Sequence, residues 1–482
     1  MKIQGLNPYL PSYEYIPDGE PRIFNNRVYI YGSHDRFDGE KFCMNDYVCW
    51  SAPADDLGNW RYEGVIYRKT QEPINASGER NLFAPDVEQG PDGRYYLYYS
   101  MMGTVSVAVC DSPAGKYEFY SYVQYPDGTQ LGRKPGDNVN FDPAILVDDD
   151  RRVFLYSGVI SDPDYREMIK NSGLLCDGSY CIELEQDMRT VKAAPVLVVP
   201  FDGEDYEGHI FHEGSSIRKV NNLYYFVYSS REGHELCYAT CDIPNGRFAY
   251  GGILVSNGDI GFNGRDKKDA VNYTGNTHGG MLAVNGKNYI FYHRQTNLHH
   301  YSRQGCAEEI IINTDGSIEQ VEMTSCGLND GPLNGKGEYG FYIACNLLSS
   351  KGTCFYPHNK MEPEIHPYFT QDSPDADTDG HQFISNFCDG AVAGFKYFNF
   401  VNARSITVKA RGNMNGLLEV YSSHDLPATT KTNELPVAVI NLTPSSDWIS
   451  FDAQINIENG ISPLFFTFSG TGSADLMSFI LA

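Results

Sequence analysis

Apolar positions in the first two thirds of the chain fall in short aromatic runs that recur at a regular spacing. Each run has four or five residues rich in Tyr, Phe, Val and Ile, a composition typical of β-strands. Each follows a polar turn, such as Asp92-Gly93-Arg94 before the second run. The five runs are 28–31, 95–99, 153–156, 224–228 and 288–292. Their spacing of about 60 to 70 residues suits one four-stranded sheet per repeat, which predicts a five-bladed β-propeller.

One polar residue precedes each aromatic run by about the same distance. In a propeller the first strand of each blade lines the central channel, so side chains at this position converge at one mouth. A single Asp before a strand is ordinarily a turn or cap residue. Five polar residues at matching phase are not expected from the alternative fold, a stack of unrelated sandwiches. The five are Asp18, Asp86, Asp142, Glu213 and His278.

The last third of the chain has a different pattern. A Gly/Asn/Pro-rich stretch from about 329 to 339 predicts a linker. Alternating apolar and polar positions beyond it predict a β-sandwich of the jelly-roll type, in segments 405–410, 417–421, 437–440 and 464–468. We therefore expect an all-β chain with a propeller over residues 1–328 and a sandwich over residues 340–482.

Composition and charge narrow the function classes. The formal net charge of −25 would repel a phosphate backbone, so we expect no nucleic-acid partner. No apolar run is long enough to span a bilayer, so we expect no membrane partner. The N-terminus lacks the apolar run of a secretory signal, and the twelve cysteines lack zinc-site spacing. Reduced thiols and a cytoplasmic location are therefore expected, with an exported, trimmed precursor as the alternative.

Several carboxyl groups gathered in one cleft indicate acid–base chemistry. Like charges push their pKa values apart, so that one carboxyl keeps a proton near neutral pH while another is ionised. Glycoside hydrolysis needs this pair: an acid protonates the leaving oxygen, and a carboxylate activates water or attacks directly. A separation of roughly 6.5–9.5 Å would predict inversion, and about 5–5.5 Å retention.

The blade-start motifs resemble those of glycoside hydrolase family 43 over about residues 5–325. The motifs are Pro17-Asp18-Gly19-Glu20-Pro21, Ala84-Pro85-Asp86-Val87, Asn140-Phe141-Asp142-Pro143-Ala144, His212-Glu213-Gly214-Ser215 and Thr277-His278-Gly279-Gly280. The resemblance implies a five-bladed propeller, an inverting mechanism and glycans that contain arabinose and xylose. It also implies that Asp18 is the general base, that Glu213 is the general acid, and that Asp142 tunes and orients the acid.

The first motif departs from the family pattern. Members of the family usually have Asp-Pro at the position of the general base. Here Asp18 is followed by Gly19, and a second acidic residue, Glu20, precedes Pro21. Glu20 is therefore the alternative base. Counting back from the first aromatic run favours Asp18.

The resemblance also implies residues that bind the substrate. Arg303 matches an arginine that reaches the sugar in the terminal subsite, with Arg294 as the nearby alternative. Phe83 and Phe141 flank motif residues and are expected to stack on a sugar face, with a core position as the alternative. Either arginine would otherwise pair with surface acids.

Three further polar residues complete the predicted site. Asp86 is expected at the channel mouth with the substrate, and His34 at the pocket rim. The residue that matches His278 in many relatives lies beside a calcium ion bound mostly through water, so calcium near His278 is implied by the resemblance alone. The alternative is a packed, hydrogen-bonded histidine. No organic cofactor is expected.

The order of aromatic residues in the last third resembles carbohydrate-binding module family 6. The resemblance rests on the segment 394–398, on 418–421 and on Trp448, which the pattern places in the sandwich core. A module that binds sugar and a module that has lost binding and braces the propeller are both compatible with it.

Together these features predict a hydrolase that acts from the chain end. We expect it to release terminal α-L-arabinofuranose, β-D-xylose or both from oligosaccharides derived from xylan. The alternatives are an endo-acting arabinanase or xylanase of the same fold, and a propeller that binds glycans without cleaving them.

Overall fold

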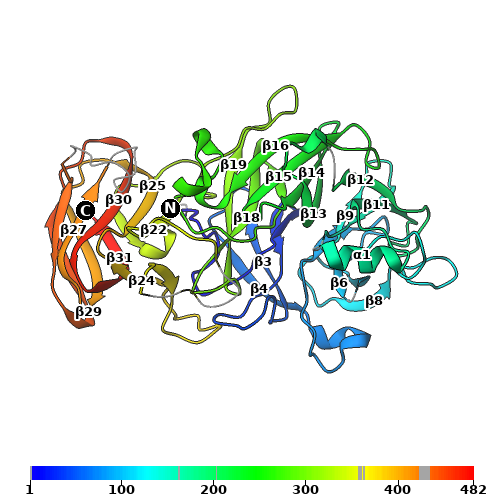
Figure 1. The fold of residues 1–482 in the computed structure, drawn as a ribbon, viewed down its shortest axis with the longest axis horizontal. Helices are drawn as coiled ribbons and strands as arrows, with labels where there is room; N and C mark the ends of the chain where they lie inside the picture. The colour runs from blue at the N-terminus through cyan, green and yellow to red at the C-terminus, as the bar shows by residue number, and fades with distance from the viewer. Residues whose placement is uncertain are drawn as a thin grey trace.

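The computed structural model describes residues 3–101, 103–160, 163–201, 204–356, 361, 364–422 and 435–482. Strands dominate this part of the chain, and Figure 1 shows two bodies joined side by side, with the N-terminus near their junction. The chain is therefore all-β, as predicted. The one α-helix of the described residues, α1 (Pro163–Asn171), lies in the third blade. No helix in the described part of the chain is long and apolar enough to cross a membrane.

Five antiparallel sheets make up the larger body. The first four each have four strands. The first is β1 (Glu20–Phe24), β2 (Arg27–Tyr31), β3 (Tyr47–Pro53) and β4 (Arg61–Tyr67). The second is β5 (Asp86–Gln89), β6 (Tyr95–Met101), β7 (Thr104–Cys110) and β8 (Glu118–Tyr122). The third is β9 (Ala144–Val147), β10 (Val153–Ser157), β11 (Gly178–Leu184) and β12 (Val196–Pro200). The fourth is β13 (Phe211–Val220), β14 (Leu223–Ser230), β15 (Glu235–Cys241) and β16 (Ala249–Ser256). The fifth has three described strands, β17 (Met281–Val284), β18 (Lys287–Gln295) and β19 (Arg303–Ile310).

The first strands of the five sheets form a closed ring. Each of β1, β5, β9, β13 and β17 contacts the first strand of the next sheet, and β17 returns to contact β1. A parallel bridge between Gly19 and Gly279 joins the first and last blades. The five-bladed propeller predicted from the sequence is confirmed.

The recurring aromatic runs form the second strand of each blade. Residues of these strands are almost all buried, because both faces of a blade pack against neighbouring blades. Tyr98, for example, is fully buried and its hydroxyl donates to the carbonyl oxygen of Met188 at 2.5 Å. The repeat can be recognised in the sequence because each blade contains one such buried apolar strand.

The smaller body is a sandwich of two six-stranded sheets. One sheet contains β20 (Leu333–Asn334), β22 (Asn346–Leu348), β25 (Val392–Phe400), β27 (Asn415–Tyr421), β28 (Ala438–Leu442) and β30 (Gly460–Thr471). The other contains β21 (Gly337–Gly340), β23 (Tyr368–Thr370), β24 (Phe383–Cys388), β26 (Ser405–Gly412), β29 (Ser445–Gln454) and β31 (Ser473–Leu481). Because β20 and β21 pair within these sheets, the sandwich includes part of the stretch read as a linker. Trp448 packs against Phe383, with 5.2 Å between ring centroids, but is only half-buried.

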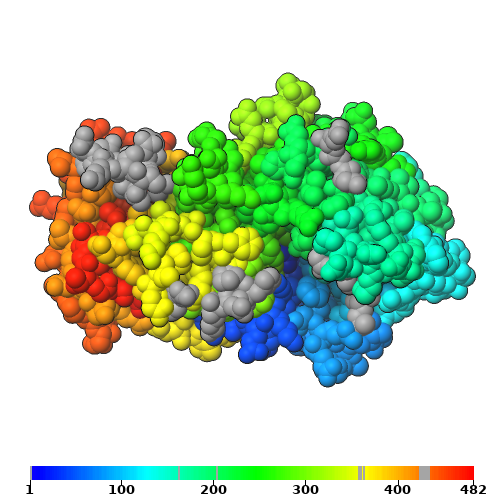
Figure 2. Space-filling view, viewed as in Figure 1, coloured from blue at the N-terminus to red at the C-terminus, as the bar shows by residue number. Residues whose placement is uncertain are grey.

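The two bodies are joined by hydrogen bonds and by a shared core. Tyr273 of the propeller belongs to the apolar core of the sandwich. The amide of Leu347 donates to the carbonyl oxygen of Val271 at 2.9 Å. In Figure 2 the yellow part of the chain, just after the propeller, lies across the junction between the green and orange parts. The sandwich is therefore packed against the propeller.

Candidate active site

A cavity of about 130 Å³ lies at the mouth of the propeller channel. It brings together seven of the predicted site residues: Asp18, Phe83, Phe141, Asp142, Glu213, His278 and Arg303. The remaining lining residues are Phe42, Cys43, Ala84 and Asn276. These side chains come from all five blades, so the site exists only once the ring has closed.

The backbone conformation at Asp18 and Asp142 helps to position their carboxyl groups. Asp18 and Asp142 each lie two residues before the first strand of their blade, with φ of 57° and 43°. This left-handed region is accessible to Asp because its short polar side chain can hydrogen-bond locally. Both carboxyl groups line the cavity, just ahead of the strand that follows each of them.

Asp18 lies in a positively charged environment. Nη1 of Arg303 is 3.1 Å from Oδ1 of Asp18, and two carboxylate oxygens of Asp35 hold the same guanidinium from the other side at 2.8 and 3.0 Å. The backbone amide of Asp18 donates to Nδ1 of His293 at 3.3 Å. Burial alone would raise the pKa of Asp18, but Arg303 and His293 outweigh it and hold the pKa below its usual range. Asp18 is therefore ionised.

Asp142 has the opposite protonation. Burial raises its pKa well above the usual range, and the charges of Glu213 and Asp18 add to this effect. Its carboxyl group therefore keeps a proton to higher pH. Glu213 shares the cavity and its side chain is a quarter exposed. Asp142 and Glu213 thus form a pair of carboxyl groups, here called the acid pair, in the same cavity as the ionised Asp18.

His278 lies between the carboxyl groups. Its Nδ1 is 3.9 Å from Oδ1 of Asp18 and 3.7 Å from Oδ2 of Asp142. Burial lowers the pKa of His278, so the ring is neutral near pH 7. Gly214, with φ of 75°, packs against this ring: a Cβ there would be 3.1 Å from it and 2.9 Å from the hydroxyl of Ser229. A side chain at 214 would therefore displace the histidine.

Glu20, the alternative base, lies outside the cavity lining. Nη2 of Arg218 is 2.6 Å from its Oε2, and the hydroxyl of Ser216 donates to the same oxygen. Burial raises the pKa of Glu20 to about 7, against the opposing effect of Arg218. The position of Asp18 in the cavity therefore agrees with the count from the first aromatic run.

The described residues that line the cavity do not include His34, Asp86 or Arg294. Asp86 forms a buried ion pair with Arg22 at 2.5 Å, inside the ring of first strands. Nε2 of His34 lies 3.3 Å from Oε1 of Glu14, and its Nδ1 is hydrogen-bonded to the carbonyl oxygen of Asp46 at 2.9 Å.

Arg294 turns toward the sandwich. Its guanidinium donates to the carbonyl oxygens of Tyr342 at 2.6 Å and Ala344 at 3.0 Å. The same group lies over the ring of Phe369, 4.0 Å from its centroid. Of the two arginines considered from the sequence, Arg303 is the one that reaches the cavity.

Sequence reasoning missed three residues with polar or aromatic side chains in the lining. Phe42 and Cys43 come from the long loop between β2 and β3, a connection whose length differs from blade to blade. Asn276 precedes His278 by two residues, and the blade-start motif could have drawn attention to it. Loop residues without a repeat give no sequence signal of this kind.

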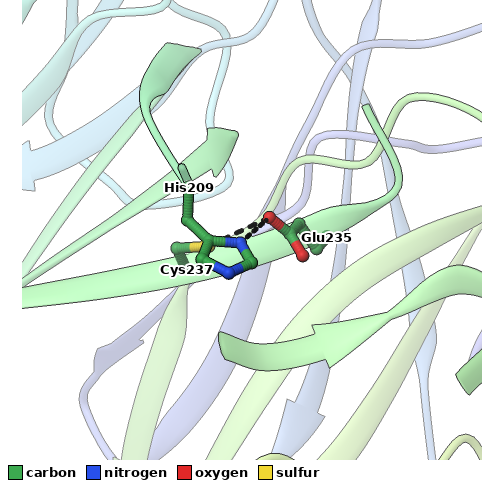
Figure 3. Close-up of side chains that lie close together, drawn as sticks. All are labelled: His209, Glu235 and Cys237. Atoms are coloured by element: carbon green, nitrogen blue, oxygen red, sulfur yellow. Dashed lines mark hydrogen bonds and ion pairs between the residues drawn. The ribbon is translucent and has the colours of Figure 1, made fainter. Parts of the chain in front are cut away.

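One further group in the described residues has the composition of a metal site. His209, Glu235 and Cys237 lie in the fourth blade, with their ligand atoms within 4.8 Å of one another (Figure 3). Hydrogen bonds explain the group without an ion: Nδ1 of His209 is 2.6 Å from Oε1 of Glu235, and Ser230 and Cys237 donate to the same oxygen. His278, the predicted metal residue, does not belong to this group.

A propeller with an ionised aspartate facing an acid pair in a small pocket defines the class of protein, a carboxylate-based glycoside hydrolase. The chain belongs to glycosyl hydrolases family 43, whose family model matches residues 20–318.

One relative in sequence and two solved structures are similar to this chain. It is 50% identical to a xylosidase/arabinosidase of Thermoclostridium stercorarium, over 100% of this chain and 99% of the relative. The structure of an arabinoxylan arabinofuranohydrolase from Bacillus subtilis, in complex with cellotetraose, matches 99% of this chain and 98% of that chain with 20% identity and a TM-score of 0.51. A β-xylosidase/α-arabinofuranosidase from a compost metagenome, in a calcium-free form with xylotriose, matches 66% of this chain and 98% of that chain with 24% identity and a TM-score of 0.50. The two structures share the fold with this chain.

Proposed function

We propose that this glycoside hydrolase releases terminal α-L-arabinofuranose, β-D-xylose or both from oligosaccharides derived from xylan. The 50% identity to a xylosidase/arabinosidase over the whole chain is the observation that carries the substrate class. The net charge of −25 also suits a neutral sugar better than an anionic substrate.

The proposed mechanism is inversion with three carboxyl groups. Asp18, held ionised by Arg303, removes a proton from the attacking water. Glu213 protonates the leaving glycosidic oxygen, and Asp142, whose pKa is raised by burial and by the neighbouring carboxyl groups, holds its own proton near neutral pH in the same cavity. Arg303 and the aromatic rings of Phe83 and Phe141 hold the sugar in the cavity.

Cavity size supports action from the chain end. A volume of about 130 Å³ is well below the few hundred Å³ of pockets that hold larger ligands. One pentose unit matches this size better than a run of several units. An endo-acting enzyme would need an open groove on both sides of the reacting sugar.

The function is tested with nitrophenyl α-L-arabinofuranoside and β-D-xyloside. We expect hydrolysis of at least one, and the first product seen by proton NMR should have the inverted anomeric configuration. On xylo-oligosaccharides the monosaccharide should be the first product. Release of internal fragments would favour the endo-acting alternative, and tight glycan binding without cleavage of any substrate would favour the non-catalytic propeller.

A cation beneath the cavity is part of this proposal. Nε2 of His278 and Oε1 of Glu20 are buried and lie 4.0 Å apart, and neither has a hydrogen-bond partner among the residues that the structure describes. The carboxylate oxygen is a ligand type that calcium prefers, and waters would supply the other ligands. Nε2 of the neutral His278 ring would accept a hydrogen bond from one of these waters, which would hold the ring beside Asp18 and Asp142. We expect calcium to raise the Tm of chelator-treated protein, and His278→Ala to abolish this rise. An equal rise in both proteins would contradict the site.

A further inference from the structure

A short segment of the sandwich half of the chain runs along the propeller mouth. Residues 353–356 lie between the sandwich strands β22 and β23, yet they pair with Thr274 of the propeller. The amide of Thr274 donates to the carbonyl oxygen of Cys354 at 3.2 Å, and the amide of Tyr356 donates to the carbonyl oxygen of Thr274 at 2.6 Å. The segment is therefore held by backbone hydrogen bonds on both sides of Phe355.

Alternation along this segment separates two aromatic side chains. Tyr356 is fully buried, packs against Tyr273 with 5.6 Å between ring centroids, and its hydroxyl donates to the carbonyl oxygen of Asn297 at 2.8 Å. Successive side chains of an extended segment point to opposite faces, so Phe355 points outward and is 52% exposed. Tyr356 anchors the segment, which leaves Phe355 without a role in the core.

The exposed ring of Phe355 lies beside the catalytic cavity. Its centroid is 5.6 Å from the ring of His300, and His300 is 6.0 Å from Phe42, which lines the cavity. On another side, Phe355 is 3.7 Å from the Cβ position of Gly233 in the turn between β14 and β15. Thr274, its pairing partner, is two residues before Asn276 of the cavity wall.

Phe355 differs from the other exposed apolar side chains in being an aromatic ring close to residues that line the cavity. In the described residues, Phe355 and Tyr62 are the two aromatic side chains among the large apolar residues with high exposure. Tyr62 lies on β4, the outer strand of the first blade, and packs against Trp50 with the two rings tilted by 52°. An exposed aromatic face next to a sugar pocket offers the flat apolar surface on which a pyranose ring stacks.

We propose that Phe355 is a specificity-determining residue that stacks on the sugar units beyond the cleaved bond. This inference rests on the proposed function. The segment that carries Phe355 belongs to the sandwich half, so that half of the chain completes the substrate site at the propeller mouth. The ligand class is a short neutral oligosaccharide of β-linked pyranose units, which extends out of the cavity past Phe42 and His300.

The experiment compares Phe355→Ala with Tyr62→Ala, which removes an equally exposed aromatic ring far from the mouth. For each protein, kcat/KM is measured on β-linked xylo-oligosaccharides of increasing length. In the wild type we expect kcat/KM to rise with length. In Phe355→Ala the ratio of the longest to the shortest substrate should fall about threefold to tenfold, mainly through KM, and Phe355→Trp should restore it. Tyr62→Ala should keep the wild-type ratio.

Two outcomes would overturn the inference. One is an unchanged ratio in Phe355→Ala. The other is an equal loss on all lengths with a lower Tm, which would make Phe355 a structural residue. If the wild type cleaves none of the glycosides, the proposed function fails, which is distinguishable because the wild-type assay comes first. In that case isothermal titration calorimetry of xylotetraose with wild type and with Phe355→Ala still tests whether Phe355 stacks on the sugar. Equal affinities of the two proteins would reject this contact.

Discussion

Asp18 and Asp142 occupy the same place in their blades and share a left-handed backbone conformation, yet their protonation differs. The cause is the neighbouring charge. Arg303 lies 3.1 Å from Asp18, whereas Asp142 shares its surroundings with the carboxyl of Glu213. Two residues of the same type thus gain different chemical roles from the side chains that other blades place beside them.

The acid assignment predicts a dependence on the leaving group. In Glu213→Gln we expect kcat to fall about 10²- to 10⁴-fold on natural glycosides, because the leaving oxygen is no longer protonated. On dinitrophenyl glycosides the loss should be much smaller, since that leaving group needs no proton. Steady-state kinetics on both substrates measures the difference, and the exposed Glu185→Gln is the control. An equal loss on both substrates would reject Glu213 as the acid.

The acid pair predicts a pH dependence. Because the pKa of Asp142 is raised, its proton is retained through neutral pH and lost as the pH rises, so the rate of the wild type should fall on the alkaline side. Asp142→Asn replaces this titrating carboxyl group with an amide that stays neutral. The alkaline limb of kcat/KM should then move to higher pH by about one unit or disappear. A profile that keeps its alkaline limb would show that Asp142 does not tune the acid.

At the scale of elements, the hairpin of β18 and β19 carries one arginine on each strand, and the two have different roles. Arg294 on β18 pairs in register with Gln304, next to Arg303 on β19. Neighbouring positions on a strand point to opposite faces, so one arginine reaches the cavity and the other reaches the sandwich. The hairpin register therefore separates substrate contact from domain packing.

This separation predicts that Arg294 acts on stability alone. In Arg294→Met the carbonyl oxygens of Tyr342 and Ala344 lose their buried donor, and the free energy of unfolding should fall by about 2–4 kcal/mol. Urea denaturation measures this loss. Arg61→Met, which removes an exposed ion pair, should cost less than about 1 kcal/mol. A raised KM in Arg294→Met at unchanged stability would instead support the sugar contact considered from the sequence.

At the scale of the whole molecule, the sandwich is a structural partner of the propeller. The amide of Asn297 donates to the carbonyl oxygen of Phe369 at 2.6 Å, and the amide of Ser325 donates to that of Lys396 at 2.7 Å. Together with Tyr273, which lies in the sandwich core, these contacts join the propeller to the sandwich. Whether the sandwich also binds sugar by itself is separate from this role.

Because the two bodies share a core, we expect the propeller to be less stable without the sandwich. A protein ended at residue 328 would expose the face that Tyr273 and its neighbours cover and would leave Arg294 without its acceptors. We expect a low soluble yield and a Tm several degrees below that of the full chain, measured by calorimetry. A truncated protein with the full Tm and full activity on nitrophenyl glycosides would contradict this packing role.

The sequence by itself determined the fold class and the blade phase. Each blade needs an apolar strand that is buried on both faces. Such strands appear in the sequence as aromatic runs, each preceded by a polar turn. Because a polar residue precedes each aromatic run by about the same distance, the sequence predicts that Asp18, Asp142, Glu213 and His278 meet at one mouth, where the structure places them.

Only the tertiary structure decided which polar residues face the cavity and which pair beneath it. Asp86 opens β5 and pairs with Tyr98, whereas Asp142 lies two residues before β9, so the two aspartates differ in phase by two positions and Asp86 pairs with Arg22 inside the ring. Phe42, from a loop with no repeat, and Phe355, from the sandwich half, lie at or beside the cavity without any local signal. Periodicity is a property of one element along the chain, whereas charge pairing and loop placement depend on contacts between residues far apart in sequence.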